Sequence, residues 1–244
     1  MPDHFIAGAG RGSSGAGFSC VAFDLDGTLY PNISLNLRIV PFLLRHQRLL
    51  IAMGRARKKL RDSDRVSGGK AENHDADFYE LQAGLMGEVM KIPMERAKEL
   101  TERLIYRGWE PHFKKIKLFP HVMETLEAFR EKKIRLGLLS DFPAEIKLEN
   151  LKIGGFWHAV LCSEQTGHLK PHPASFLELA RRMDTPPGQI LYVGNSVPYD
   201  VEGARKAGMK TALILQKWQK RPSPGSLPDF IFSDYRQLYD YVIN

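Results

Sequence analysis

The chain has 244 residues, of which 43% are hydrophobic and 26% are charged. Both fractions are typical of globular proteins, so we expect a folded, soluble protein and exclude a disordered one. No apolar run approaches the roughly 20 residues of a membrane-spanning helix, so we expect no membrane partner. The length suits one large α/β domain, or a core domain with a smaller domain inserted in it.

The N-terminal segment 1–17 is rich in glycine and has no apolar block long enough for a signal peptide. We predict that it is a flexible tail. The only cysteines, Cys20 and Cys162, both fall in apolar stretches that are typical of buried strands. Core packing is their expected role, which favours a reducing, cytoplasmic setting.

Short apolar runs recur along the chain, and most of them are followed by a helical pattern. The runs predict strands within 18–27, 134–141, 157–165, 189–196, 210–216 and 229–233. The patterns predict helices within 121–133, 143–152, 173–183, 200–208 and 233–244. Strands that are apolar throughout and alternate with helices indicate a parallel sheet covered on both faces. Functional residues are then expected at the carboxyl ends of the strands.

One interval, 34–117, breaks this alternation because it contains no good strand pattern. Its apolar spacing predicts helices within 36–60, 75–90 and 93–110, with a polar loop at 61–74. The interval therefore reads as an all-helical insert after the first strand.

The net charge of +7 is concentrated between residues 38 and 70, a segment with ten Lys or Arg residues and only two acidic residues. Such a segment can attract anionic ligands or nucleic acid. Because aromatic side chains are nearly absent from it, we favour a solvated helix face and expect no nucleic-acid partner.

Two acidic residues, Asp24 and Asp26, directly follow the apolar run "VAF" at the end of the first predicted strand. Carboxylates two positions apart point the same way along a strand, so one can attack while the other transfers a proton. Gly27 gives the following turn its backbone freedom, and Thr28 comes next. An Asp-Gly pair is also an ordinary turn signal, but a turn alone does not explain two acids after a buried run.

Three further strand ends carry polar residues. Ser140 ends the second strand in "LLSD", where a hydroxyl can bind a phosphoryl oxygen or cap a helix. Lys170 lies in "GHLKPHPASF", between a glycine turn and a proline-led helix, as a fixed cation or a surface lysine. The stretch "VGNSVPYD" places Asn195 and Asp200 where one wall of an acidic metal site would lie, with a neutral amide in the first position.

These motifs together resemble those of the haloacid dehalogenase superfamily, in its phosphatase branch. The match in residue type, order and spacing extends over nearly the whole chain from Phe18 onward. The resemblance implies an α/β fold with a Rossmann-like parallel sheet core formed by 18–33 and 118–244. It also implies that 34–117 is an all-helical cap domain over the active site.

The resemblance further implies a Mg²⁺-dependent phosphatase for a small phosphorylated metabolite. Asp24 would attack phosphorus and form an aspartyl-phosphate, and Asp26 would act as general acid and then as general base. The implied phosphate-binding residues are Gly27, Thr28, Ser140, Asp141 and Lys170, with Lys170 also counted as catalytic. The implied Mg²⁺ site consists of Asp24, the backbone carbonyl of Asp26, Asn195 and Asp200.

Asn195 departs from the family pattern, in which phosphatases usually have an aspartate. An amide oxygen is still a legitimate Mg²⁺ ligand but carries no formal charge, so our hypothesis is weaker Mg²⁺ binding with the same mechanism. Metal-free dehalogenases of the superfamily also have this asparagine, but they lack the second aspartate of the first motif. The presence of Asp26 favours a leaving group that needs a proton, and therefore a phosphatase.

Two alternatives remain open. One is another enzyme of the superfamily, such as a phosphomutase or a carbon–halogen hydrolase. The other is a catalytically weak protein that binds an anionic partner or nucleic acid through the basic segment. Against the second stands the retained set Asp24, Asp26, Ser140, Lys170 and Asp200, for which a scaffold has no chemical need. The sequence does not identify the substrate, the cap residues that reach it or the oligomeric state.

Overall fold

The structure is a computed structural model, and it describes residues 18–32, 40–42, 44–66, 77–108, 113–216, 219–226 and 228–244. The predicted tail 1–17 and most of the predicted polar loop 61–74 lie outside the described residues.

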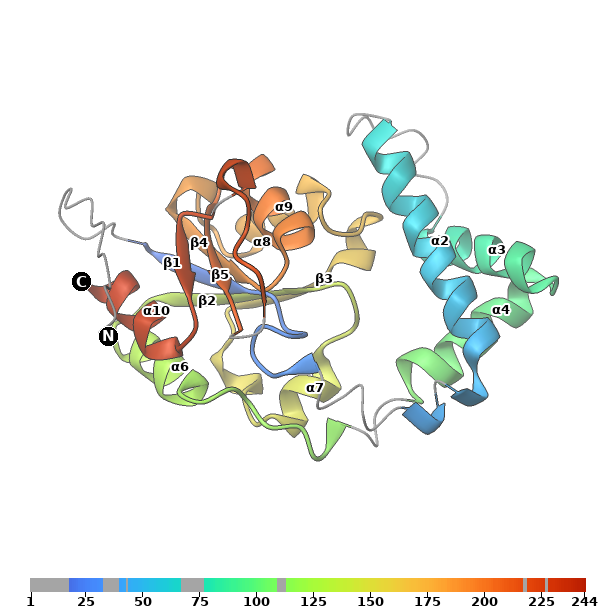
Figure 1. Ribbon diagram of the computed structural model, residues 1–244, viewed down its shortest axis with the longest axis horizontal. Coiled ribbons are helices and arrows are strands. Elements are labelled where there is room, and N and C mark those ends of the chain that lie inside the picture. The colour runs from blue at the N-terminus through green and yellow to red at the C-terminus, as the bar shows by residue number, and fades with distance from the viewer. Residues whose placement is uncertain are drawn as a thin grey trace, which may run out of the picture.

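Six parallel strands form a single sheet in the order β3-β2-β1-β4-β5-β6 (Figure 1). They are β1 (Cys20–Phe23), β2 (Arg135–Ser140), β3 (Ala159–Cys162), β4 (Ile190–Gly194), β5 (Lys210–Ile214) and β6 (Phe230–Phe232). Strand β1 is central, with Cys20 opposite both Arg135 of β2 and Ile190 of β4. The chain order switches sides between β1 and β4, which is where open parallel sheets form their binding crevices.

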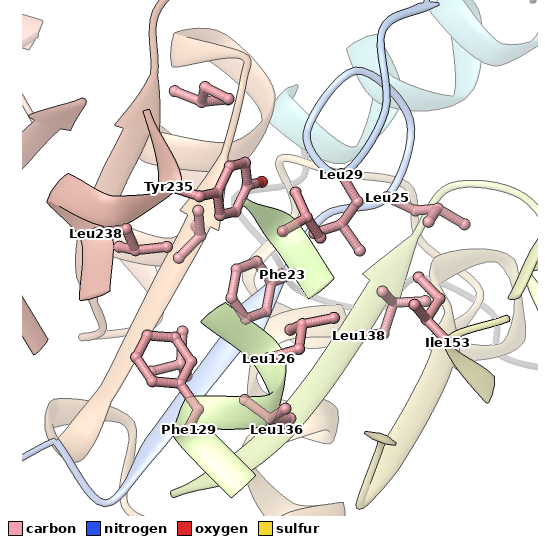
Figure 2. Close-up of a cluster of buried hydrophobic side chains, with 14 of the residues drawn as sticks. Phe23, Leu25, Leu29, Leu126, Phe129, Leu136, Leu138, Ile153, Tyr235 and Leu238 are labelled. Atoms are coloured by element: carbon pink, nitrogen blue, oxygen red, sulfur yellow. The ribbon is translucent and has the colours of Figure 1, made fainter. Parts of the chain in front are cut away.

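Helices cover both faces of the sheet. Successive side chains of β1 point to opposite faces, so each face has apolar side chains to bury. Val21 and Phe23 pack with α6 (Val122–Glu131) and α10 (Tyr235–Ile243), in the cluster of buried side chains that Figure 2 shows. Cys20 and Ala22 pack on the other face with α8 (Pro173–Arg182) and α9 (Glu202–Lys206). A short helix, α7 (Glu145–Asn150), follows β2. The predicted parallel α/β sheet is confirmed, and both cysteines are buried free thiols.

The interval between β1 and α6 contains helices with a core of their own. They are α2 (Gln47–Val66), α3 (Phe78–Met90), α4 (Met94–Leu100) and the π-helical turn η1 (Thr101–Tyr106), which we call the helical insert. Leucine, alanine and methionine side chains from these elements form a separate buried cluster. Figure 1 shows α2, α3 and α4 gathered to one side of the sheet. The boundaries 34 and 117, and the role of a cap domain, remain predictions.

The predicted end of the first insert helix at residue 60 is wrong, because α2 continues to Val66 through residues expected in a loop. The polar character of this stretch suggested a loop, but the Arg61 side chain contacts the sheet domain and the Ser63 side chain bonds within the helix. The Ser63 hydroxyl donates to the Lys59 and Leu60 carbonyls, at 2.9 and 3.0 Å. None of the described helices combines the length and the apolar character needed to cross a membrane.

The two ends of the interval that holds the helical insert lie next to each other. The Phe119 N–H donates to the Leu29 carbonyl at 2.9 Å, which joins the segment before α6 to the turn after β1.

Candidate active site

The predicted site residues Asp24, Lys170 and Asp200 come together at the carboxyl edge of the sheet. Asp24 directly follows β1, Lys170 lies in the loop before α8, and Asp200 lies in the π-helical turn η5 (Val197–Val201) after β4. The Lys170 Nζ lies 2.7 Å from Asp24 Oδ1 and 2.7 Å from Asp200 Oδ1. All three side chains are buried, at 7% exposure or less. The ammonium therefore bridges two carboxylates that would otherwise repel each other.

Burial and neighbouring charges set the protonation of this trio. Burial raises the pKa of Asp24 to about 7; the Lys170 ammonium opposes this rise, whereas the Asp200 and Asp26 carboxylates add to it. Burial by itself would lower the pKa of Lys170, but the Asp200 and Asp24 carboxylates hold it well above its usual value. Lys170 is therefore a permanent cation. The Thr28 hydroxyl donates to Asp24 Oδ2 at 2.8 Å, so both oxygens of this carboxylate are oriented.

Three hydrogen bonds from the protein hold the Asp200 carboxylate. Its Oδ2 accepts the backbone N–H groups of Asn195 at 3.1 Å and Ser196 at 3.0 Å, while Oδ1 accepts from Lys170. Gly194, the last residue of β4, makes this close approach possible. A Cβ at Gly194 would lie 2.3 Å from the Asp200 Cβ, so a larger residue would displace the carboxylate.

Asn195 lies against the turn of the first motif. Its Oδ1 accepts from the Thr28 hydroxyl at 3.4 Å. Its Nδ2 would lie 2.3 Å from a Cβ at Gly27, whose φ of +87° is in the left-handed region. Glycine at 27 is therefore needed twice, for the turn and for the space that Asn195 occupies.

The oxygen atoms at this edge could hold a divalent cation, although together they carry little negative charge. Within the described part of the chain, no cluster of three or more His, Cys, Asp or Glu side chains could hold a metal. The oxygens that fit Mg²⁺ are those of the Asp24 carboxylate, the Asn195 amide and the Asp26 backbone carbonyl, which supply one formal charge. Asp200 already accepts from Lys170 and from two backbone N–H groups, so its contribution to such a site would be mainly its charge.

The Asp26 carboxylate has two partners that sequence reasoning missed. Lys147 of α7 donates to Oδ1 at 2.8 Å and to Oδ2 at 2.7 Å, and the Tyr30 hydroxyl also donates to Oδ1. Burial, followed by the charge of Asp26, raises the pKa of Tyr30, so its hydroxyl stays protonated. Lys147 sits in a predicted amphipathic helix, where its sequence context resembles that of an ordinary surface lysine.

Ser140 is the last residue of β2, and Asp141 directly follows the strand, which ends one residue before the predicted end at 141. Ser140 is fully buried, and its hydroxyl oxygen accepts the Phe142 N–H at 3.2 Å. The Asp141 carboxylate accepts from the Ser163 hydroxyl at 2.6 Å and from the Lys170 N–H at 3.1 Å. As an anion, this side chain repels phosphate, so only its backbone could contribute to the predicted phosphate binding.

Two arginines of α2 contact the sheet domain beside the site. Arg57 pairs with Glu164 of the turn η3 (Ser163–Thr166), and its guanidinium lies 4.2 Å from the centre of the Phe142 ring. Arg61 pairs with Asp141 at 2.7 Å and donates to the Lys170 carbonyl at 2.9 Å. The expectation of a solvated helix face is therefore wrong for these two residues, although Lys59 between them is 68% exposed.

Lys170 holds the buried Asp24 carboxylate at the point where the strand order of the parallel sheet switches. The chain is therefore an α/β protein of the class that binds ligands at the carboxyl ends of its strands. The model of the haloacid dehalogenase-like hydrolase family matches residues 18–208. The chain therefore belongs to this hydrolase family, as its motifs predict, and it is an enzyme of that family related to phosphomonoesterases.

Curated relatives align over most of their length. The chain is 30% identical over 233 residues to a glyceraldehyde 3-phosphate phosphatase of Methanopyrus kandleri, covering 91% of this chain and 96% of the relative. It is 30% identical over 234 residues to a phosphoglycolate phosphatase of Escherichia coli K12, covering 89% and 90%.

Solved structures share the fold. A phosphatase of the family from Thermococcus onnurineus superposes with a TM-score of 0.61 at 22% identity, covering 92% of this chain and 97% of the other. The L-2-haloacid dehalogenase from Xanthobacter autotrophicus gives a TM-score of 0.60 at 16% identity, covering 92% and 98%. Because phosphatases and dehalogenases both match at low identity, these likenesses show the fold alone.

Proposed function

We propose that the protein is a Mg²⁺-dependent phosphomonoesterase that hydrolyses a small phosphorylated metabolite through an aspartyl-phosphate on Asp24. The observation that carries this proposal is the bridge from Lys170 to Asp24 and Asp200, with both distances at 2.7 Å. It fixes a buried carboxylate at the sheet edge with a cation against it, and this supports the binding of an anionic substrate there.

In the proposed reaction, an oxygen of Asp24 attacks phosphorus while the bond to the leaving oxygen breaks. Asp26 gives a proton to that oxygen, and then takes one from the water that hydrolyses the aspartyl-phosphate. Lys170 and Ser140 hold the phosphoryl oxygens, together with the turn at Gly27 and Thr28. Two moderate barriers thereby replace one high barrier.

Mg²⁺ would be held by Asp24, the Asp26 carbonyl and Asn195, with Asp200 close by. When bound, it supplies positive charge that screens an anionic nucleophile from an anionic phosphate. Lys170 already offsets part of this repulsion. The weak donor set and the additional lysine together support a modest affinity for the ion.

Relatives suggest which substrates to test first. The proteins with 30% identity are named for glyceraldehyde 3-phosphate and phosphoglycolate, both small phosphate esters. Asp26 also favours a phosphate ester over a haloacid, since an alkoxide leaving group needs a proton and a halide does not. We propose a cytoplasmic setting, to which the two buried free thiols are suited.

The test is hydrolysis of p-nitrophenyl phosphate, glyceraldehyde 3-phosphate and phosphoglycolate, each with and without Mg²⁺, by the wild type and by Asp24→Asn. A matched control is Asp240→Asn, because Asp240 is an exposed residue of α10. Wild-type turnover that Asp24→Asn abolishes and Asp240→Asn retains would support the proposal. Absence of turnover across a broad panel of phosphate esters with Mg²⁺ present would favour the alternative of a binding protein, and turnover of 2-chloropropionate alone would favour a dehalogenase.

A further inference from the structure

Each aspartate of the first motif has a buried lysine of its own. Asp24 is held by Lys170, whereas Asp26 is held by Lys147 of α7, which is 121 residues away in sequence. Lys147 Nζ contacts both carboxylate oxygens of Asp26, at 2.8 and 2.7 Å. The Lys147 side chain is 6% exposed and that of Asp26 is 27% exposed, so the open side of this pair belongs to the carboxylate. The proposed reaction assigns Lys147 no task.

Aromatic rings enclose the Lys147 ammonium. Its Nζ lies 5.3 Å from the centre of the Phe113 ring and 5.8 Å from that of Phe142. Ring faces attract a cation and exclude water from it. These attractions add to the contacts with the two Asp26 oxygens. Lys147 is therefore a fixed charge.

The contacts of the Asp26 carboxylate leave little freedom for rotation. A carboxylate has about four acceptor sites. Tyr30 and Lys147 use two of them on Oδ1, and Lys147 uses one on Oδ2. The remaining site is on Oδ2, and the orientation of this lone pair is set by the protein.

The ion pair of Lys147 and Asp26 is not expected to add much to the stability of the fold. Removing two charges from water costs several kcal/mol per ion, and their attraction often only balances this cost. A geometric role is the better explanation, because the transfer of a proton requires a donor within about 2.6–3.2 Å of its acceptor and correctly oriented.

We infer that Lys147 is a positioning residue, which holds the Asp26 carboxylate so that its remaining Oδ2 site faces the leaving oxygen. This inference rests on the proposed function. In the first step, Asp26 enters with a proton on its remaining Oδ2 site. The bond from Asp24 to phosphorus forms, the bond from phosphorus to the leaving oxygen breaks, and this proton moves from Asp26 to that oxygen. Lys147 acts through Asp26 and touches neither the phosphorus nor the leaving group.

The test compares leaving groups that need a proton with one that does not. Lys147→Met retains the length of the side chain without its charge, Lys147→Arg retains the charge, and Lys132→Met is a control at an exposed lysine. Three substrates whose organic groups carry no ionised substituent are used: butyl phosphate, phenyl phosphate and 2,4-dinitrophenyl phosphate. For Lys147→Met we expect kcat/KM, which reports the steps up to formation of the aspartyl-phosphate, to fall about 100-fold with butyl phosphate but less than about 3-fold with 2,4-dinitrophenyl phosphate. Lys147→Arg should recover part of the loss.

Two kinetic outcomes would overturn the inference. Equal losses of kcat/KM for all three leaving groups would show a structural role only. Phosphoglycolate, whose leaving group is anionic, is assayed as a fourth substrate, and a loss of kcat/KM confined to it would show that Lys147 binds substrate instead.

A second measurement separates this inference from the proposed function. Urea unfolding of Lys147→Met, Asp26→Asn and the double variant reports on the pair without any turnover. We expect the shifts in unfolding midpoint to be clearly non-additive. Additive shifts would refute the pairing even in an active phosphatase. A wild type that hydrolyses no phosphate ester would instead refute the proposed function, and with it the task assigned to Lys147.

Discussion

The Arg57 guanidinium and the Glu164 carboxylate form a buried ion pair between the helical insert and the sheet domain, with 5% and 0% of their side chains exposed. Tyr106 of η1 also donates to Glu164, at 3.0 Å, so two elements of the insert meet on one carboxylate. Burial raises the pKa of Glu164, and the Arg57 guanidinium opposes that rise. The pair links the placement of the insert to the loop that precedes Lys170.

We expect removal of one partner of this pair to be more harmful than removal of both. Arg57→Met should lower the free energy of unfolding by about 3–5 kcal/mol, because it leaves the Glu164 charge buried without its main partner. The double variant Arg57→Met/Glu164→Leu should regain a large part of this loss. Urea denaturation followed by circular dichroism measures both. A double variant that loses the sum of the two single losses would contradict the coupling of these residues.

Gly194→Ala should impair the site without a comparable effect on the fold. The new Cβ would lie 2.3 Å from the Asp200 Cβ and 2.6 Å from its Oδ2, so the carboxylate would have to leave Lys170. We expect kcat/KM for p-nitrophenyl phosphate to fall at least about tenfold, with a stability loss of about 1–3 kcal/mol from overpacking. Gly154→Ala is the matched control, because no atom lies within 4 Å of its Cβ position. Equal activity of the two variants would show that the Asp200 contact with Lys170 is dispensable.

Asn195→Asp should strengthen Mg²⁺ binding. The substitution adds a formal charge to a donor set that has one, and the Mg²⁺ concentration for half-maximal activity should fall about tenfold, equivalent to about 1.4 kcal/mol. The stabilisation of the fold by added Mg²⁺, measured as a rise in Tm, should increase in parallel. An unchanged Mg²⁺ requirement would count against Asn195 as a ligand.

The Asp141 carboxylate should make stability depend on pH in the acidic range. Burial acts to raise its pKa, but the charges of Lys170, Arg57 and Arg61 outweigh this and hold it below its usual value of 3.8. A depressed native pKa means that the stabilising effect is complete above the unfolded pKa of about 3.9 and is lost as pH falls through the native value.

Comparison with Asp141→Asn isolates this effect. The wild type should be more stable than the variant by about 1–3 kcal/mol at pH 6, as expected for hydrogen bonds to a charged group. The difference should shrink progressively below about pH 4. Urea unfolding of both proteins between pH 6 and pH 3 gives the two curves. A difference that is constant over this range would show that Asp141 is not the titrating group.

The sequence predicted best those functional residues that directly follow a strand. Apolar runs predicted the strands, and parallel pairing then brought Asp24, Ser140 and Asn195 to the same edge. The order of the sheet did not have to be known for this, because every strand of a parallel sheet ends on the same side.

The partners of these residues could not be predicted in the same way. Lys147 meets Asp26, and Arg57 meets Glu164 over 107 residues of chain, because of how helices are rotated and placed against the sheet. Periodicity identifies the apolar face of a helix but not which cation at its border will reach a distant carboxylate. For the same reason the basic segment suggested a solvated surface, although Arg61 reaches Asp141.

The backbone hydrogen bond from Phe119 to Leu29 has a consequence for how such enzymes can diversify. Since the chain leaves and re-enters the sheet domain at one point, everything between these two residues is topologically a single long loop. Loop length affects stability only weakly, by about 0.6 kcal/mol per doubling. Chain length therefore sets little limit on the size of the insert. The limit comes from Arg57 and Arg61, because any other insert would have to supply equivalent cations to Glu164 and Asp141 beside Lys170.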